Sequence, residues 1–520
     1  MMKRCGLLAV VTFVCQHAGA QVLTSQYNNA RTGATLVETT LTPANVNAQQ
    51  FGKLFSWSVD GDVYAQPLYM PGVNVPGKGA YDVVYVATEH DSVYAFDAQR
   101  QRTEPLWHVS FLGPSITTVP AEDVQCPFIA PEIGITPTPV IDPVSGTLYV
   151  LARTKESDGV GRPRYVQRLH ALAVATGTEQ FGGPVEIAAS VKGTGAGASD
   201  GRVAFDPLLE LPRAGLLLAG GQVYLTWGSS CDVKPYHGWV MAYAASTLRQ
   251  TAVLNTSPDG NESGIWQSDM APAADEDGHV YVATGNGSYD AAAGGRNYGD
   301  SLLKLRLGGN QLAVRDAFTP PNRADLNARD KDLGSGGPTL LPESSGRRLV
   351  LIAGKEGPLH VLDRDRLKEG TVQALPLGGG AYAAGAYWNG HVFFVASNDS
   401  LRDFALADGR LSDRPVASGR QRFANPGAAP VVSAHGTRDG IVWLIETKVW
   451  NDYASTKASV LRAYDATNVA RELFNSEQSG ARDRAGVTVR FAIPTVANGR
   501  VYVGAKGEVT VYGLLTTKTQ

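Results

Sequence analysis

The stretch RLVLIAGKEGPLHVLDR (residues 348–364) carries the pattern that determines the fold. Two apolar runs, 348–354 and 358–364, flank the short polar segment Lys355-Glu356-Gly357. Each run is rich in β-branched and leucine residues and is bounded by turn-forming residues, which is typical of the two strands of a hairpin. The stretch therefore predicts two adjacent antiparallel strands with a basic side chain in the loop between them.

Seven further pairs of the same kind occur along the 520 residues. The eight pairs lie at 82–88 and 92–98, 147–153 and 168–174, 222–228 and 238–244, 279–285 and 301–307, 348–354 and 358–364, 391–397 and 400–406, 441–447 and 459–465, and 500–506 and 508–514. The starts of successive pairs are between 43 residues (348 to 391) and 75 residues (147 to 222) apart. Such a repeat with variable spacing indicates one structural unit with insertions in its loops.

Most pairs are preceded by a third apolar run, and several are followed by a fourth. TPTPVID (136–142) and AIPTVAN (492–498) are examples of the third run, and EPLWHVSF (104–111) is an example of the fourth. No long helical periodicity is present. Four antiparallel strands per unit, repeated radially, predict an all-β fold, an eight-bladed β-propeller of four-stranded blades.

The last unit lacks a fourth strand of its own. FGKLFSWSV (51–59) precedes the first unit and has the pattern of a strand. We expect this N-terminal strand to complete the eighth blade, because closing the ring removes an open sheet edge. Residues 21–520 are then predicted to form a single propeller domain.

The first twenty residues have the pattern of a signal peptide. Lys3 and Arg4 precede an apolar stretch (7–14), and Ala18-Gly19-Ala20 is a small-residue cleavage signal. No later run of about 18 apolar residues is present, so we expect no membrane span. The mature chain is therefore predicted to be exported, to the periplasm or the medium.

Charge and cysteine content limit the kinds of partner and cofactor that the sequence predicts. The formal charge of −3 and the absence of a basic run give no indication of nucleic-acid binding. Removal of the signal leaves only Cys126 and Cys231, and two cysteines in an oxidising compartment often pair. Two unrelated buried thiols remain the alternative. The sequence has no C-x-x-C-H haem-attachment motif, so the chain carries no c-type haem of its own.

The propeller topology sorts the polar residues by face. The loops between second and third strands and the connections between blades open on the same side, around the central channel. That side is predicted to gather acids, an aromatic plate, a lysine and both cysteines, which makes it the default place for a ligand. Its candidate residues are Cys126, Cys231, Asp232, Trp266, Asn286, Asp330, Asp332 and Lys355.

The order of motifs in the middle of the chain resembles the dehydrogenases that depend on pyrroloquinoline quinone (PQQ), a family of eight-bladed propellers. The motifs are WGSSCD (227–232), Trp266, HVYVATGN (279–286), RDKDLGSGGPTLLP (329–342) and KEGPLHVLDR (355–364). The opening segment LTPANVNAQQFGKLFSWSVDGD (41–62) is also similar to that of the family. The resemblance covers most of the chain, and its specific part is residues 227–364.

The resemblance implies a role for each candidate. Trp266 matches the tryptophan under the quinone ring, and Lys355 matches the cation that contacts the quinone oxygens. Asn286 matches a ligand of the family's calcium or lanthanide ion. Asp330 and Asp332 match the segment that contains the catalytic base, and which of the two is the base stays open. We predict that Asp330 is the base and that Asp332 and Asp232 are metal ligands alongside Asn286.

The implied activity is oxidation of an alcohol or sugar-like hydroxyl, with electrons passed to a separate acceptor. Two features of this chain differ from the family. It has no adjacent cysteine pair, and the family's metal-binding glutamate in the third blade has no clear counterpart, Asp232 being the nearest. These differences favour an alternative hypothesis, a non-catalytic propeller scaffold that binds a protein or a cell-envelope component.

Overall fold

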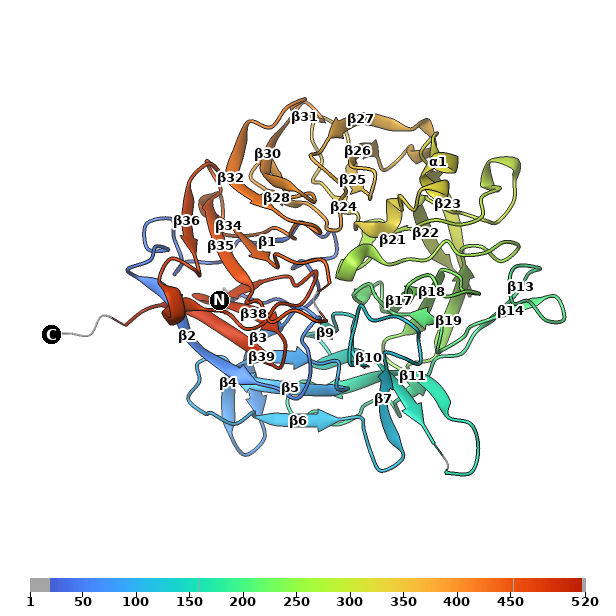
Figure 1. Cartoon of the computed structure of the whole chain (residues 1–520), viewed down its shortest axis with the longest axis horizontal. Coiled ribbons are helices and arrows are strands. Elements are labelled where there is room, and N and C mark those ends of the chain that lie inside the picture. The colour runs from blue at the N-terminus through green and yellow to red at the C-terminus, as the bar shows by residue number, and fades with distance from the viewer. Residues whose placement is uncertain (1–18, 158, 452, 517–520) are drawn as a thin grey trace, which may run out of the picture.

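The computed structural model describes residues 19–157, 159–451 and 453–516. The predicted leader falls almost wholly outside these residues. Eight small antiparallel sheets are arranged in a ring around a central axis, and the chain passes round the ring from one sheet to the next (Figure 1). The fold is thus the predicted all-β, eight-bladed propeller.

Every predicted pair of runs is an antiparallel pair of second and third strands. The pairs are β4 (Gly79–Ala87) with β5 (Ser92–Asp97), β10 (Thr147–Glu156) with β11 (Arg164–Ala173), β17 (Gln222–Ser229) with β18 (Trp239–Ala244), β21 (His279–Ala283) with β22 (Leu302–Gly308), β25 (Leu349–Ala353) with β26 (Pro358–Asp363), β29 (His391–Phe394) with β30 (Asp399–Ala407), β34 (Arg438–Glu446) with β35 (Val460–Asp465), and β38 (Arg500–Ala505) with β39 (Glu508–Leu514).

The first strand of each blade faces the channel and is often short. These strands are β3 (Leu68–Val75), β9 (Val140–Asp142), β16 (Leu217–Ala219), β20 (Ala273–Ala274), β24 (Thr339–Leu340), β28 (Ala386–Trp388), β33 (Val431–His435) and β37 (Thr495–Ala497). Several follow a proline, such as Pro338, Pro430 and Pro494. Proline lacks an N–H and is tolerated at the first residue of an edge strand, which is its position here.

The outer strands of the first seven blades are β6 (Trp107–Ser110), β12 (Val185–Glu186), β19 (Gln250–Asn255), β23 (Gln311–Phe318), β27 (Thr371–Pro376), β32 (Ala417–Phe423) and β36 (Glu472–Asn475). Short additional strands decorate the blades: β1 (Ala34–Thr35), β7 (Ile116–Pro120), β8 (Glu132–Ile133), β13 (Ser190–Lys192), β14 (Arg202–Ala204), β15 (Glu210–Leu211) and β31 (Arg410–Leu411).

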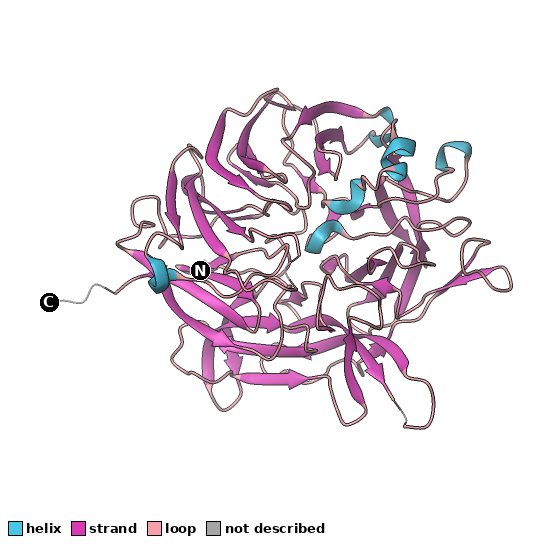
Figure 2. Cartoon of the chain, in the orientation of Figure 1, coloured by secondary structure: helices cyan, strands magenta, loops and turns pink. Residues whose placement is uncertain are grey.

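Helices are few and short (Figure 2). They are α1 (Arg323–Ala328) and the 3₁₀ turns η1 (Gln267–Asp269), η2 (Ala291–Ala293), η3 (Leu333–Ser335), η4 (Leu367–Glu369) and η5 (Gly480–Asp483). Across the described ranges, none of these helices has the length and apolar character needed to cross a bilayer.

The eighth blade is closed by the N-terminal strand β2 (Phe51–Ser58), as predicted. β2 pairs antiparallel with β39 over its whole length, from Phe51 opposite Leu514 to Ser58 opposite Glu508. Trp57 anchors the strand, since its ring stacks on Phe96 of the first blade, 4.6 Å between centroids. Joining the two ends of the chain in one sheet leaves the ring without an open blade.

A second N-terminal segment, residues 22–33, was not predicted. It crosses the channel as an irregular coil, and we call it the hub segment. At least one hydrogen bond, of 2.7 or 2.8 Å, joins it to the first strand of each blade. The partners, in blade order, are Val22 with Tyr69, Leu23 with Ile141, Asn29 with Leu218, Asn29 with Ala274, Ala30 with Leu340, Thr32 with Tyr387, Gly33 with Val432, and Tyr27 with Val496.

Arg31 holds the hub segment in shape. Its guanidinium is fully buried and donates to the carbonyl oxygens of Pro272 (2.9 Å) and Ser25 (2.7 Å) and to the Thr24 hydroxyl (2.8 Å). Burial lowers the pKa of Arg31 to about 9, so the side chain is still charged at neutral pH. Arg31 thus bonds the hub segment to itself and to Pro272, the residue just before the first strand of blade 4.

The substitution Arg31→Ala is expected to lower the free energy of unfolding by roughly 2–4 kcal/mol, because charge-assisted hydrogen bonds are lost and buried carbonyls are left unpaired. Denaturant unfolding followed by circular dichroism measures the change. Arg329→Ala is the matched control, because Arg329 is exposed and its ion pair is with the equally exposed Asp325, four residues earlier in the chain. Equal stability of the two variants would show that the hub segment does not depend on Arg31.

Candidate functional site

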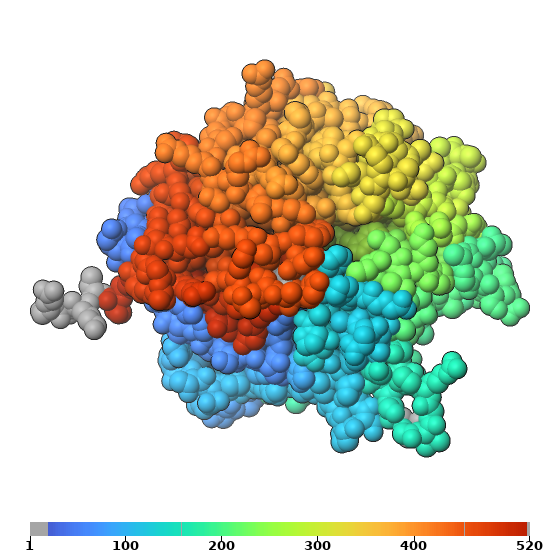
Figure 3. Space-filling view, viewed as in Figure 1, coloured from blue at the N-terminus to red at the C-terminus, as the bar shows by residue number. Residues whose placement is uncertain are grey.

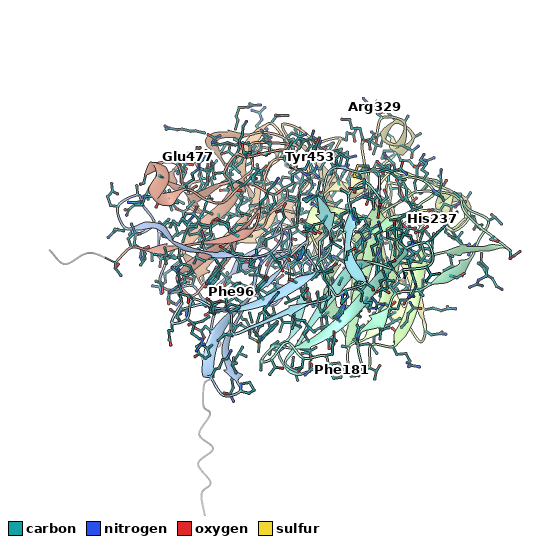
Figure 4. All side chains as sticks on the ribbon, turned by 60° about the horizontal axis from the view of Figure 1, so that its bottom comes forward. Phe96, Phe181, His237, Arg329, Tyr453 and Glu477 are labelled. Carbon is teal, nitrogen blue, oxygen red and sulfur yellow. A yellow bond between two sulfur atoms is a disulfide. The ribbon has the colours of Figure 1, made fainter. Side chains whose placement is uncertain are left out.

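The loops between second and third strands share a face with the blade connections, as the topology predicted. In Figure 4 the labelled residues His237, Arg329 and Tyr453, which come from such loops and connections, lie towards the top. Phe181, from a turn between third and fourth strands, lies at the bottom. The upper face in that view is the one turned to the viewer in Figure 3, where the surface is hollowed near the middle of the ring.

A cavity of about 150 Å³ lies on this face and brings most of the predicted site residues together. Trp266, Asp332 and Lys355 line it, as do Asp232 and the two cysteines. Asp330 and Asn286 are not part of its lining but contact the residues that are.

Trp266 lies against backbone. Three glycines from three different segments, Gly228, Gly264 and Gly285, are so close that a Cβ on any of them would come within 2.7–2.8 Å of the indole. The indole N–H donates to the Ser229 carbonyl oxygen at 3.0 Å, and the ring of Tyr236 packs edge-on at 5.8 Å. The indole is therefore fixed in position and presents a flat aromatic surface to the cavity.

Asn286, Asp330, Asp332 and Lys355 form one network, which we call the Lys355 cluster. The Lys355 ammonium lies 2.7 Å from Asp330 Oδ1 and also contacts Asp332 Oδ2. The Asn286 backbone N–H donates to Asp332 Oδ1 at 2.7 Å, and its side-chain amide donates to Asp330 Oδ1 at 3.0 Å. These contacts join the ends of β21 and β25 to the connection between α1 and η3.

The two aspartates of the cluster differ in exposure. The side chain of Asp332 is 8% exposed and lines the cavity, whereas that of Asp330 is 66% exposed at the rim. Burial raises the pKa of Asp332 above the ordinary value, and Lys355 together with the Asn286 N–H offsets part of that shift. Burial disfavours the charged form of Lys355, but the carboxylates of Asp332 and Asp330 outweigh it and raise the pKa of Lys355. Asp332 is thus a more basic carboxylate than an exposed aspartate.

A further acid lies behind the cluster. Asp300 is buried and accepts the Leu333 N–H at 3.1 Å. Burial, with a contribution from the neighbouring Asp332, raises the pKa of Asp300 to about 7. Asp300 lies just before β22, and its burial beside Asp332 depends on how η3 packs on β21 and was not predicted.

The predicted disulfide is confirmed. Cys126 and Cys231 are bonded, with 5.5 Å between their Cα atoms, and both line the cavity. Cys126 lies in the connection between blades 1 and 2, and Cys231 in the second-to-third loop of blade 3. The bond therefore ties two neighbouring parts of the channel mouth together.

The expected metal ligands are only partly gathered. The Oδ1 atom of Asn286 is buried and has no hydrogen-bond partner among the described residues, which makes it an available oxygen donor. Asp232 is exposed, and its Oδ1 accepts the Tyr236 hydroxyl at 2.9 Å, so its contacts are with blade 3 and not with the Lys355 cluster. A compact group of metal-ligating side chains among the described residues, Asp275, Asp277 and His279, lies at the opposite end of β21.

The rest of the cavity is lined by residues that sequence analysis missed. Phe128, Tyr382, Trp450 and Phe491 form an aromatic wall, together with the buried cations Arg213 and Arg490. The Arg490 guanidinium lies 4.5 Å from the ring centroid of Phe128 and 5.2 Å from that of Trp450. All six residues lie in blade connections or in a second-to-third loop, so the rule that placed Trp266 and Lys355 on this face also applies to them.

Glu89 lies below the cavity, in the second-to-third turn of blade 1. It is fully buried, and its Oε2 accepts the Gly134 N–H (2.8 Å) and the Thr136 hydroxyl (3.1 Å). Burial raises the pKa of Glu89 to about 8 despite these bonds and the nearby charge of Arg213. The folded state therefore favours the protonated acid at neutral pH.

This pKa has a consequence for stability. The contribution of Glu89 is fully present below its ordinary pKa of 4.5 and is lost as the pH rises through about 8. We expect the free energy of unfolding of the wild type to fall more between pH 5 and pH 9 than that of Glu89→Gln. Denaturant unfolding at each pH measures the difference, with the exposed Glu343→Gln as control. Parallel curves for wild type and Glu89→Gln would contradict it.

The fold resembles that of several solved structures of dehydrogenases. Quinohemoprotein alcohol dehydrogenase ADHIIG from Pseudomonas putida HK5 superposes with a TM-score of 0.62 at 14% identity, covering 96% of this chain and 81% of that chain. The quinohemoprotein alcohol dehydrogenase from Comamonas testosteroni gives 0.60 at 15%, covering 96% and 81%. A europium-containing methanol dehydrogenase gives 0.61 at 13%, covering 95% and 98%.

No family model and no curated protein sequence matches the chain. At 13–15% identity the likeness to these structures establishes the fold and leaves the activity to be argued from the site.

Proposed function

We propose that the protein is an exported quinoprotein oxidoreductase that oxidises an alcohol or sugar-like hydroxyl with PQQ and a bound metal ion. The observation that carries the proposal is the convergence of Trp266, Asp332 and Lys355 on one cavity, with Asn286 bonded to Asp332 behind them. These residues come from four separate segments between 266 and 355, and their types are those that the resemblance requires. The likeness to alcohol and methanol dehydrogenases supports the same class.

The residues present fit the quinone. Trp266 offers a rigid aromatic surface on which a flat ring can stack. PQQ is acidic, and Lys355, Arg213 and Arg490 are the cations along the cavity. When bound, PQQ supplies the oxidising power, because it accepts hydride from the carbon that bears the hydroxyl.

The Lys355 cluster also offers oxygen donors for a calcium or lanthanide ion. Hard cations prefer carboxylate and amide oxygens, and the unpartnered Oδ1 of Asn286 is such a donor beside the carboxylates of Asp330 and Asp332. Asp232 makes its hydrogen bonds elsewhere, which leaves it a weaker candidate.

Asp332 is the better candidate for the base. A general base must reach the substrate hydroxyl and be basic enough to take its proton. Asp332 lines the cavity and has a raised pKa, whereas Asp330 is exposed at the rim and bonded to Lys355 and Asn286. We therefore assign proton removal to Asp332 and give Asp330 the role of holding Lys355. The Lys355 ammonium then stabilises negative charge that develops in the cavity.

Export and electron transfer belong to the same proposal. The expected leader and the disulfide support a periplasmic or secreted protein. Because the sequence has no haem-attachment motif, electrons would leave to a separate acceptor.

The direct test uses the mature protein with PQQ and either calcium or a lanthanide. We expect saturable PQQ binding by absorbance titration, and dye-linked oxidation of members of an alcohol and sugar panel. Asp332→Asn, assayed at saturating PQQ and metal, should lower kcat by at least about 100-fold, since general bases contribute typically 10²–10⁴-fold. Absence of PQQ binding with every metal would exclude this function and leave the scaffold hypothesis.

The glycines beneath Trp266 give a second test of the site. A Cβ at Gly285 would lie 2.4 Å from Asp332 Oδ1 and 2.7 Å from the Trp266 ring, so Gly285→Ala must displace both. We expect this variant to weaken PQQ binding at least about 10-fold with little change in the unfolding transition. Gly113→Ala is the control, because its Cβ would meet nothing within 4 Å. Unchanged PQQ affinity in Gly285→Ala would mean that the cofactor does not lie on Trp266.

A further inference from the structure

The aromatic wall lines the rest of the cavity and begins beside the Lys355 cluster, where Tyr382 is within electrostatic range of Lys355 and Asp332. Trp266 and the cluster come from the segments around blades 3 to 5, near β17, β21 and β25, whereas three of the four wall residues come from blades 6 to 8 (Figure 1). Tyr382 lies in the connection before blade 6, Trp450 in the loop between β34 and β35, and Phe491 in the connection before blade 8. Phe128 belongs to the connection between blades 1 and 2. A molecule in the cavity therefore meets acids and a lysine over one part of the lining and aromatic rings over much of the rest.

The four rings form one continuous surface. The ring centroids of Tyr382 and Trp450 are 5.1 Å apart, those of Phe128 and Trp450 6.2 Å, and those of Tyr382 and Phe491 6.1 Å. These distances lie in the range of favourable aromatic contacts. Because each ring comes from a different segment of the chain, the wall exists only when the propeller is assembled.

The backbone of Phe491 is strained. Its φ of 61° lies in the left-handed region, which bulky residues rarely adopt and which costs on the order of 1–3 kcal/mol. Its ring is held between Tyr382 at 6.1 Å and the Arg213 guanidinium at 5.0 Å. Strained backbone of this kind is found at functional sites, which accords with the position of Phe491 at the cavity.

The wall offers little to a polyol. A sugar can stack the C–H face of its ring on an aromatic side chain, but the hydroxyls around its edge then need a matching array of planar polar side chains. On this side of the cavity, Arg213 and Arg490 are the charged groups among the described lining residues. Arg490 stacks against Phe128, Trp450 and Phe491 and donates to the Phe128 carbonyl oxygen at 2.9 Å. A ligand at the aromatic wall therefore contacts mainly apolar, polarisable side-chain surface.

We propose that the aromatic wall binds the body of the substrate, and that this substrate is an aryl-substituted alcohol rather than a sugar or polyol. The ring of the alcohol packs against Trp450 and its neighbours, and the hydroxyl points across the cavity to Asp332. The orientation of the hydroxyl rests on the function proposed above, whereas the selection of an aryl group rests on the wall itself.

Binding is measured directly, by ligand-observed saturation-transfer NMR and by competition. The probes are 3-phenylpropan-1-ol and methyl α-glucoside, each tested on the mature protein with and without PQQ. We expect saturable binding of the aryl alcohol only. Trp450→Leu should weaken that binding about 5- to 10-fold, in line with the loss of one aromatic contact, and Trp450→Phe should retain most of it.

Tyr453→Leu is the matched control, because Tyr453 lies in the same loop but is exposed and outside the cavity. The proposal is overturned if the glucoside binds as tightly as the aryl alcohol, if the aryl alcohol does not bind, or if Trp450→Leu and Tyr453→Leu behave alike. Failure of PQQ to bind would overturn the proposed dehydrogenase function alone, since the alcohol is also tested on the protein without PQQ. In the PQQ-loaded protein, Trp450→Leu should raise KM for the aryl alcohol more than it lowers kcat.

Discussion

The inner edge of every blade needs hydrogen-bond partners, and the hub segment supplies one to each of the eight. A propeller keeps its sheet edges short and protected. The first strand of each blade nevertheless presents backbone groups to the channel. Residues 22–33 satisfy these strands in a single crossing of the channel. An irregular segment with a left-handed conformation at Gln26, Tyr27 and Arg31 can turn towards successive blades, which a regular strand cannot do.

The hub segment also supports the cavity above it. Ser25 Oγ donates to the Asp269 carbonyl oxygen at 3.4 Å, and Arg31 donates to that of Pro272. Both acceptors lie in the connection between blades 3 and 4, which contains Trp266. Ser268, which lies between Trp266 and these acceptors in sequence, lines the cavity. The same connection is also hydrogen-bonded to η3, since the Ser268 hydroxyl donates to the Ser335 carbonyl oxygen at 2.7 Å. The indole and Asp332 are thus positioned through backbone contacts that begin at the N-terminus.

The repeat pattern was enough to predict the strands and the closure of the ring, because each blade buries both faces of its apolar second and third strands. The Cys126–Cys231 bond was one of two alternatives that the sequence left open, and the structure decides in its favour. The hub segment was not, since its bonds use mainly backbone carbonyls and its sequence, VLTSQYNNARTG (22–33), has no strand periodicity. The choice between Asp330 and Asp332 also required the structure, because the two are separated by one residue in irregular backbone and differ only in which side chain is buried.

The charge of the Lys355 cluster constrains what the cavity can hold. Two carboxylates and one ammonium leave it with one net negative charge, in surroundings where burial has already raised the pKa of Asp332. An acidic cofactor placed beside such a cluster is repelled, and a metal ion alone would compete with Lys355 for Asp330 and Asp332. Under the proposed function, a divalent ion would reverse the net charge, and an acidic cofactor would then give the freed Lys355 ammonium a new partner. Each ligand would thereby increase the affinity for the other, as linkage requires, so the same four side chains would favour joint binding over the binding of either ligand alone.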